Sequence, residues 1–255
     1  MAAKGLESDE APWQKMVKVF GARTAKNNAA HLLPHLKSNF RILDVGCGIG
    51  SITIDLANLV LDGEVVGIDT NESTTPMAQQ MAQDKGVSNV KFSFGDAHDL
   101  SAFPDESFDV VHAHQVALHL PNPVKALKEM RRVLKTGGVL SLRDNIDLMH
   151  YPLDPWIQKN QDWFRDLSRK SGANPQGGSY THDWTHQAGF PWDKIDSAVV
   201  SWSVSTLEDR RFWASGGKNA FRTMGLKAGY GNEKDYDEIE RAWEAWAEKD
   251  EGRMV

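Results

Sequence analysis

The chain has 255 residues, of which 40% are hydrophobic and 25% charged, so we expect one globular domain or one domain with an appended cap. A formal net charge of −6 with scattered Lys and Arg argues against a nucleic-acid surface, and no apolar run approaches the ~20 residues that span a bilayer. The single cysteine, Cys47, excludes internal disulfides and cysteine-rich zinc sites, and the lack of a signal-peptide pattern predicts a cytoplasmic protein.

Two short amphipathic helices are predicted before residue 41, because apolar residues recur at helical spacing over 13–20 and again over 29–36. We interpret residues 1–40 as an N-terminal helical lid. The polar connection between these helices contains Arg23. Its side chain is either solvated or pairs with a ligand carboxylate, to which a guanidinium is well suited.

Residues 41–50, Arg-Ile-Leu-Asp-Val-Gly-Cys-Gly-Ile-Gly, predict a buried strand that turns sharply into a helix. Gly46, Gly48 and Gly50 lack Cβ atoms, so a ligand can lie against bare backbone at the helix N-terminus. Asp44 disfavours the phosphates of a dinucleotide but suits the ammonium and sulfonium of S-adenosylmethionine (SAM). We interpret Cys47 as a small residue in a tight turn rather than a catalytic thiol.

A second buried strand, residues 64–69, ends in Asp69, 19 residues after Gly50. An acid at about this interval accepts from the ribose hydroxyls of nucleotide cofactors, and a carboxylate supplies two acceptor oxygens. Thr70 follows and is expected beside the adenosine.

The pattern from Asp44 to Gly50, acid-x-Gly-x-Gly-x-Gly, resembles the first motif of class I SAM-dependent methyltransferases. The runs 103–109 and 131–138 resemble the ubiquinone/menaquinone-biosynthesis group of small-molecule methyltransferases, with Thr136 where that group usually has proline. The resemblance implies that Asp96 accepts from the adenine amino group, that Ala97 offers backbone contacts, and that His114 touches the methionine part of SAM. By strand alternation, we expect the neighbouring His112 to be a hydrogen-bonded core residue.

Strands alternate with helices as far as residue 143, which predicts an α/β fold with a doubly wound, mainly parallel sheet of seven-stranded, Rossmann-like type. We expect residues 41–150 to form the SAM-binding core. Residues 151–255 are predicted to belong to the same domain, with a helical cap inserted after strand five, a helix from 154 to 171, a strand at 195–205 and helices at 207–226 and 233–248. Only residues 252–255 remain for the closing antiparallel strand, so either that strand is very short or the natural chain is longer.

The resemblance implies methyl transfer by in-line displacement to a small acceptor. Eight of the nine tryptophans lie at or beyond Trp156, and their large flat surfaces suit an apolar or aromatic acceptor. His119 and Tyr151 are candidate general bases by position only, as are Asp144 and His150. A SAM-binding protein without methyl transfer is the alternative. A nicotinamide oxidoreductase fits the glycine spacing less well. No metal is expected, and monomer and homodimer are both open.

Overall fold

The computed structural model describes residue 21, residues 23–219 and residues 221–255. The chain divides into two compact units. Within the described residues, the first unit comprises 21–114 with 128–143, and the second comprises 115–127 with 144–255.

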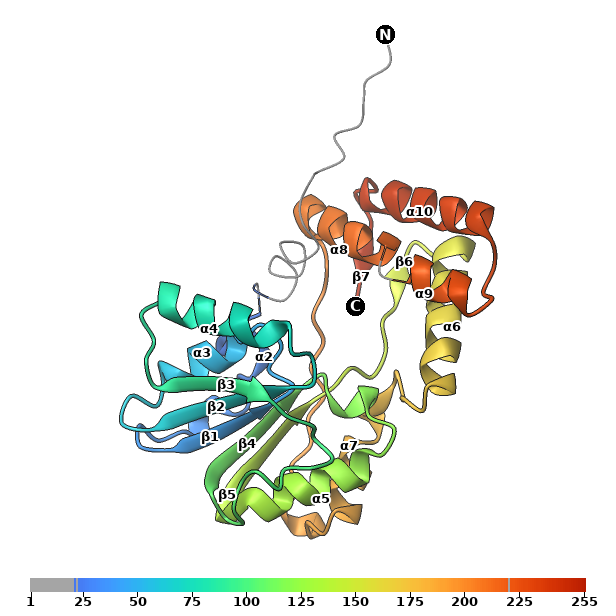
Figure 1. Cartoon of the computed structure of the whole chain (residues 1–255). Helices are drawn as coiled ribbons and strands as arrows, with labels where there is room; N and C mark the ends of the chain where they lie inside the picture. Colours follow the sequence, from blue (N-terminus) through green and yellow to red (C-terminus); the bar gives the residue numbers. More distant parts are fainter. Residues whose placement is uncertain (1–20, 22, 220) are drawn as a thin grey trace. The chain divides into compact units, whose positions relative to one another are not determined.

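The first unit is built on a parallel sheet of five strands in the order β3-β2-β1-β4-β5 (Figure 1). The strands are β1 (Arg41–Val45), β2 (Glu64–Asp69), β3 (Val90–Phe94), β4 (Phe108–His114) and β5 (Leu134–Arg143). Neighbouring strands are parallel throughout. The predicted α/β, doubly wound class is therefore confirmed, although this sheet has five strands within the described residues instead of seven.

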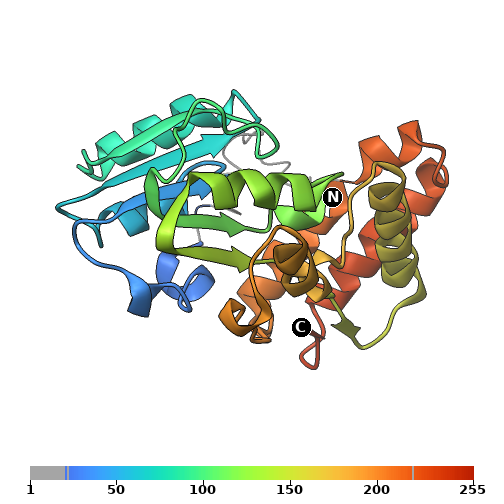
Figure 2. The same cartoon turned by 90° about the horizontal axis from the view of Figure 1, so that it is seen from below.

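Helices cover both faces of this sheet (Figures 1 and 2). On one face lie α3 (Ser51–Ala57) and α4 (Thr74–Asp84), and on the other lies the part of α5 (Pro123–Val133) that belongs to the first unit. Leu56 of α3 packs in one core cluster with Ile42, Val65 and Val110 from the first, second and fourth strands. The apolar runs of the sequence thus form strands that are buried on both faces.

The N-terminal part differs from the prediction. Residues 25–28 form α2 (Ala25–Asn28), and residues 33–35 form the 3₁₀ turn η1 (Leu33–His35) in place of a helix over 29–36. Pro34 lies within the predicted helix and lacks the N–H that an α-helix interior requires. Leu32 is nevertheless buried, as its apolar spacing suggested. The helix expected over 13–20 lies outside the described residues.

The second unit consists mainly of helices packed around Tyr236, Trp243 and Trp246. Its longest helices are α6 (Pro155–Lys170), α8 (Leu207–Asn219) and α10 (Glu233–Ala247). Asp154 caps the first of these by accepting from the backbone N–H groups of residues 156 and 157. The remaining elements are η2 (Ala117–His119), η3 (Gly177–Ser179), α7 (Thr181–Gln187), η4 (Trp192–Lys194) and α9 (Arg222–Lys227).

The strand predicted over 195–205 is wrong. This stretch is irregular apart from a single bridge between Val204 and Met254, and Val199 and Val200 are 78% and 65% exposed. The alternation of apolar residues did not produce a buried face here, so it did not specify a strand. The short C-terminal strand exists as β7 (Arg253–Met254), but it pairs antiparallel with β6 (His150–Tyr151) in a separate two-stranded sheet.

Candidate functional site

The candidate site in the first unit lies where β1, β2 and β4 end. The parallel register places Val45 beside both Ile68 and Ala113, so the segments after these residues emerge at one edge. The strand order reverses between β1 and β4, and ligands of open α/β sheets bind at such a switch point.

The loop from Gly46 to Gly50 requires glycine at alternate positions. Gly46, Gly48 and Gly50 have φ values of 72°, 54° and 79°, in the left-handed region that residues with a Cβ rarely adopt. The N–H groups of Gly46 and Cys47 donate to the Ile68 carbonyl at 2.8 and 3.0 Å, which ties the loop to β2. A Cβ at Gly50 would lie 2.7 Å from the Phe92 ring, whereas one at Gly48 would meet no atom within 4 Å. At Gly48 the loop therefore has space in front of its backbone.

Asp69 joins this loop to the end of β2. The Gly48 N–H donates to Asp69 Oδ2 at 2.8 Å, and the Asn71 N–H donates to Oδ1 at 2.8 Å. A carboxylate oxygen accepts two hydrogen bonds, so both oxygens retain acceptor capacity. Thr70, the next residue, is exposed. This geometry is compatible with acceptance from two vicinal hydroxyls.

Asp44 lies inside the protein and is only 3% exposed. The hydroxyl of Thr53 donates to its Oδ2 at 2.6 Å. Burial raises the pKa of Asp44 to about 7, an effect that the Thr53 hydrogen bond opposes and the negative charge of Asp69 increases. The first strand thus carries, just before the glycine loop, a buried carboxyl group whose pKa is strongly raised.

Burial also raises the pKa of the Cys47 thiol, a group that lies near both Asp44 and Asp69. The nucleophile would be the thiolate, which this environment disfavours. The structure therefore supports the interpretation of Cys47 as a turn residue.

The turn after β3 holds Asp96 and Ala97. Asp96 Oδ1 accepts from the backbone N–H of His98 at 2.8 Å and lies 2.8 Å from His98 Nδ1. The Asp96 side chain remains half exposed, and Ala97 is buried. These contacts with His98 hold the Asp96 carboxylate within the turn after β3.

His114, the last residue of β4, is buried, and its Nε2 lies 3.3 Å from Asn28 Nδ2. Burial, together with the positive charge of Arg23, lowers the pKa of His114 to about 3. Arg23 is itself partly buried, and burial together with Arg143 lowers its pKa to about 10. His112, two residues earlier, is a core residue whose Nδ1 lies 3.0 Å from the Ser141 hydroxyl.

The candidate bases belong to the second unit. His119 and Tyr151 are both exposed, and the Tyr151 carbonyl accepts from Trp246 Nε1 at 2.9 Å. His150 is buried, and its Nε2 accepts from the N–H of Asp154 at 3.1 Å. The structure therefore gathers the predicted cofactor residues at one edge of the first unit, while the predicted bases lie on the other unit.

Asp144 is the most perturbed acid of the second unit. Its Oδ1 accepts from the Leu118 N–H at 3.4 Å, and its Oδ2 is buried without a partner among the described residues. Burial raises the pKa of Asp144 to about 6. A carboxyl group with such a pKa can exchange protons near neutral pH.

Asn28, which contacts His114, was not predicted. In the sequence it is one polar residue in a polar connection, and only the tertiary structure brings it to a residue 86 positions away. Thr53, the partner of Asp44, was missed for the same reason. No motif or spacing in the sequence distinguishes either residue from its polar neighbours.

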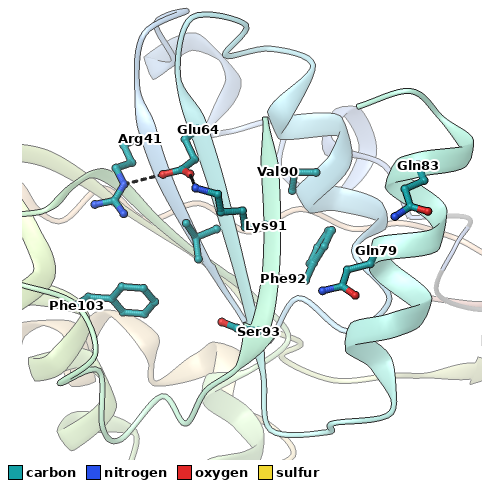
Figure 3. A pocket seen from close by; sticks show the side chains of 10 residues that line it. Arg41, Glu64, Gln79, Gln83, Val90, Lys91, Phe92, Ser93 and Phe103 are labelled. Atoms are coloured by element: carbon teal, nitrogen blue, oxygen red, sulfur yellow. Dashed lines mark hydrogen bonds and ion pairs between the residues drawn. The ribbon is translucent and has the colours of Figure 1, made fainter. Parts of the chain in front are cut away.

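A separate cavity of about 610 Å³ lies along β3 (Figure 3). Its walls include Arg41 and Glu64, the first residues of β1 and β2, which form an ion pair at 3.1 Å. Glu64 also pairs with Lys91. Because Arg41 and Glu64 begin their strands, these cavity walls lie at the sheet edge opposite the glycine loop.

Comparisons with known proteins agree with this fold. The model of a methyltransferase domain family matches residues 36–197. An uncharacterised methyltransferase of Schizosaccharomyces pombe is 29% identical over 248 residues, which cover 90% of this chain and 86% of the relative. The uncharacterised methyltransferase YcgJ of Bacillus subtilis is 38% identical over 124 residues, and that alignment spans only 46% of YcgJ.

Solved structures show the same architecture. The crystal structure of YcgJ from Bacillus subtilis matches with a TM-score of 0.56 at 23% identity, covering 84% of this chain and 88% of YcgJ. The crystal structure of the [4+2]-cyclase SpnF matches with a TM-score of 0.54 at 22% identity, covering 92% of this chain and 82% of SpnF. At these identities the likeness concerns the fold alone. Within the described residues, no helix is long and apolar enough to cross a membrane, and no group of three His, Cys, Asp or Glu side chains is arranged to hold a metal ion.

Proposed function

We propose that this chain, which belongs to the methyltransferase domain family, transfers the methyl group of SAM to a small apolar or aromatic molecule. The observation that carries the proposal is the junction of Asp69 with the glycine loop. The N–H groups of Gly48 and Asn71 hold the two carboxylate oxygens separately, at 2.8 Å each, and each oxygen can accept one further hydrogen bond. This junction suits the two hydroxyls of a ribose.

The other residues of the first unit fit the rest of SAM. Asp96 and Ala97 would contact the adenine, and Thr70 would lie beside the adenosine. Arg23 and His114 would face the amino-acid part, and the loop at Gly46 and Gly48 would pass along it. The buried acid Asp44 suits a cationic ligand, because a nearby positive charge favours its ionised form.

Bound SAM supplies a methyl carbon that its sulfonium has already made electrophilic. The chain must then exclude water and hold the acceptor in line, and orientation of this kind supplies as much as ~7–11 kcal/mol of a barrier. For an acceptor that must lose a proton, we propose His119 or Tyr151 as the base. Asp144 also qualifies, because its pKa is raised to about 6.

An apolar or aromatic acceptor is supported by the composition of the second unit, which holds eight of the nine tryptophans. The relatives provide a weaker argument in the same direction. A sterol 24-C-methyltransferase of Aspergillus fumigatus, which by its name acts on a sterol, is 38% identical over 116 residues, but the alignment covers only 30% of that enzyme.

Calorimetric titration with SAM and with S-adenosylhomocysteine tests the cofactor assignment. We expect both to bind the wild type, and we expect Asp69→Ala to weaken binding by about 10- to 100-fold because it removes two charge-assisted hydrogen bonds. Asp62→Ala is the matched control, because Asp62 is an exposed acid of the same unit. Equal affinities for the two variants would contradict the proposed ribose contact.

Transfer itself requires a second measurement, since the same fold includes a protein described as a cyclase. Incubation with methyl-labelled SAM and a panel of small apolar and aromatic acceptors should yield S-adenosylhomocysteine and a labelled product. Tight binding of SAM without either product across the panel would favour the alternative, a SAM-binding protein that does not transfer the methyl group.

A further inference from the structure

The amide of Asn28 is hydrogen-bonded at both of its ends. The backbone N–H of Thr24 donates to Asn28 Oδ1 at 3.2 Å, and Asn28 Nδ2 lies 3.3 Å from His114 Nε2. A backbone N–H can only donate, so the oxygen of the amide must face Thr24 and the NH₂ group must face His114. The opposite orientation of the amide would set two donors against each other at Thr24.

This orientation determines where the imidazole of His114 carries its proton. The Asn28 NH₂ group donates, so His114 Nε2 must be the unprotonated acceptor and Nδ1 must carry the hydrogen. The doubly protonated ring is excluded near neutral pH, because burial lowers the pKa of His114 to about 3. The charges of four surrounding groups also contribute to this lowered pKa, namely those of Arg23, His112, Arg143 and His31.

The Nδ1–H group is buried and has no hydrogen-bond partner among the described residues. Buried donors nearly always have partners, so an unpartnered one at a candidate site indicates a ligand acceptor. The nearby positive charges of Arg23 and Arg143 favour an acceptor that is an anion.

We infer that Asn28 is a positioning residue that fixes His114 as an Nδ1–H donor for an anionic oxygen of the ligand. On the basis of the function proposed above, that oxygen belongs to the carboxylate of SAM. Asn28 acts through His114 and through the Thr24 N–H that orients its amide.

Nitrogen-15 NMR of the imidazole rings of the ligand-free protein tests the tautomer directly. The His114 signals are identified by their loss in His114→Gln. We expect a protonated Nδ1 and an unprotonated Nε2 in the wild type. A protonated Nε2 would overturn the inference, and this result needs no variant at position 28.

Asn28→Asp should reverse the tautomer, because the introduced carboxylate accepts from both Thr24 N–H and His114 Nε2. We expect Nε2 to become protonated in this variant. Asn27→Asp is the matched control, since it makes the same change of charge at an exposed neighbouring position of α2. A His114 Nε2 that stays unprotonated in Asn28→Asp, or gains a proton equally in both variants, would overturn the inference. Thermal unfolding of both variants shows that the comparison concerns folded protein.

Binding then tests the acceptor. At about pH 8, where a neutral imidazole is expected, Asn28→Asp should bind S-adenosylhomocysteine at least about tenfold more weakly than Asn27→Asp, because an Nδ1 lone pair would face the carboxylate. KM for SAM should rise while kcat changes little. Equal affinities of the two variants would overturn the assignment of the acceptor. No binding to the wild type would count against the proposed function, while the NMR result would still decide the tautomer.

Discussion

Replacement of Asp44 by Asn should make the ligand-free protein more stable at alkaline pH while weakening its affinity for SAM. In the wild type, burial raises the pKa of Asp44 from 3.8 to about 7. The folded protein therefore holds a proton at pH values at which the unfolded chain has released it. Asn retains an oxygen that can accept from the Thr53 hydroxyl, and it carries no charge at any pH.

The sign of the effect follows from proton linkage. Because the folded protein binds the proton more tightly, the free energy of unfolding of the wild type falls as pH rises from about 4 to about 7. The difference of about 3 pKa units corresponds to an upper limit of about 4 kcal/mol. Between about pH 5 and about pH 8 the same two pKa values give about 2–3 kcal/mol. The contribution is absent in Asp44→Asn.

Urea unfolding of both proteins between about pH 5 and about pH 8 measures this difference. Tryptophan fluorescence reports mainly on the second unit, where eight of the nine tryptophans lie. Labelling of Cys47, the single cysteine of the chain and a residue of the glycine loop, reports on the first unit. Labelling through the unfolded chain is compared at the same pH, where the thiol of the two unfolded proteins reacts alike, so the pH dependence of the labelling reaction cancels.

The stability gain of Asp44→Asn over the wild type should increase with pH by about 2–3 kcal/mol over this range. Any packing defect from the substitution is independent of pH and shifts all the values equally. Parallel pH profiles for the two proteins would refute the reasoning, because Asp44 would then not titrate in this range. Calorimetry with SAM should show weaker binding to Asp44→Asn, and unchanged affinity would contradict the role of Asp44 toward a cationic ligand.

Three further predictions concern the glycine loop, the second unit and the candidate base. Gly48→Ala and Gly86→Ala both place a Cβ at a positive φ with no atom within 4 Å, so each should lower the free energy of unfolding by about 1 kcal/mol. Only Gly48→Ala should weaken SAM binding in calorimetry. Equal binding by the two variants would contradict the role of the glycine loop. Trp246→Phe removes the hydrogen-bond donor to the Tyr151 carbonyl from a fully buried ring. Fluorescence-detected unfolding should show that the free energy of unfolding falls by about 1–3 kcal/mol. An unchanged free energy of unfolding would show that this hydrogen bond is not stabilising. If Asp144 is the base, the pH profile of kcat for an acceptor that loses a proton should rise around pH 6, and a profile that keeps this rise in Asp144→Asn would exclude it.

The sequence alone determined the class of the fold and the place of the candidate site. After Arg41, the first strand is apolar except for Asp44, and three alternate glycines follow it. The turn and its backbone conformation could therefore be predicted from local chemistry. Asp69 could be predicted as the second acid because it lies 19 residues after Gly50, close to the interval at which an acid accepts from ribose hydroxyls. These features are local or periodic, so they can be recognised in the sequence without knowledge of tertiary contacts.

Tertiary structure decided the rest. The alternating residues from Ile195 to Ser205 have the pattern of a strand, but Val199 and Val200 are exposed, and burial rather than alternation alone determines whether such a pattern pairs. The pairing of Asn28 with His114 joins positions that are 86 residues apart. Which proton His114 carries, and how strongly Asp44 holds its own, depend on desolvation and on charges brought close only by folding.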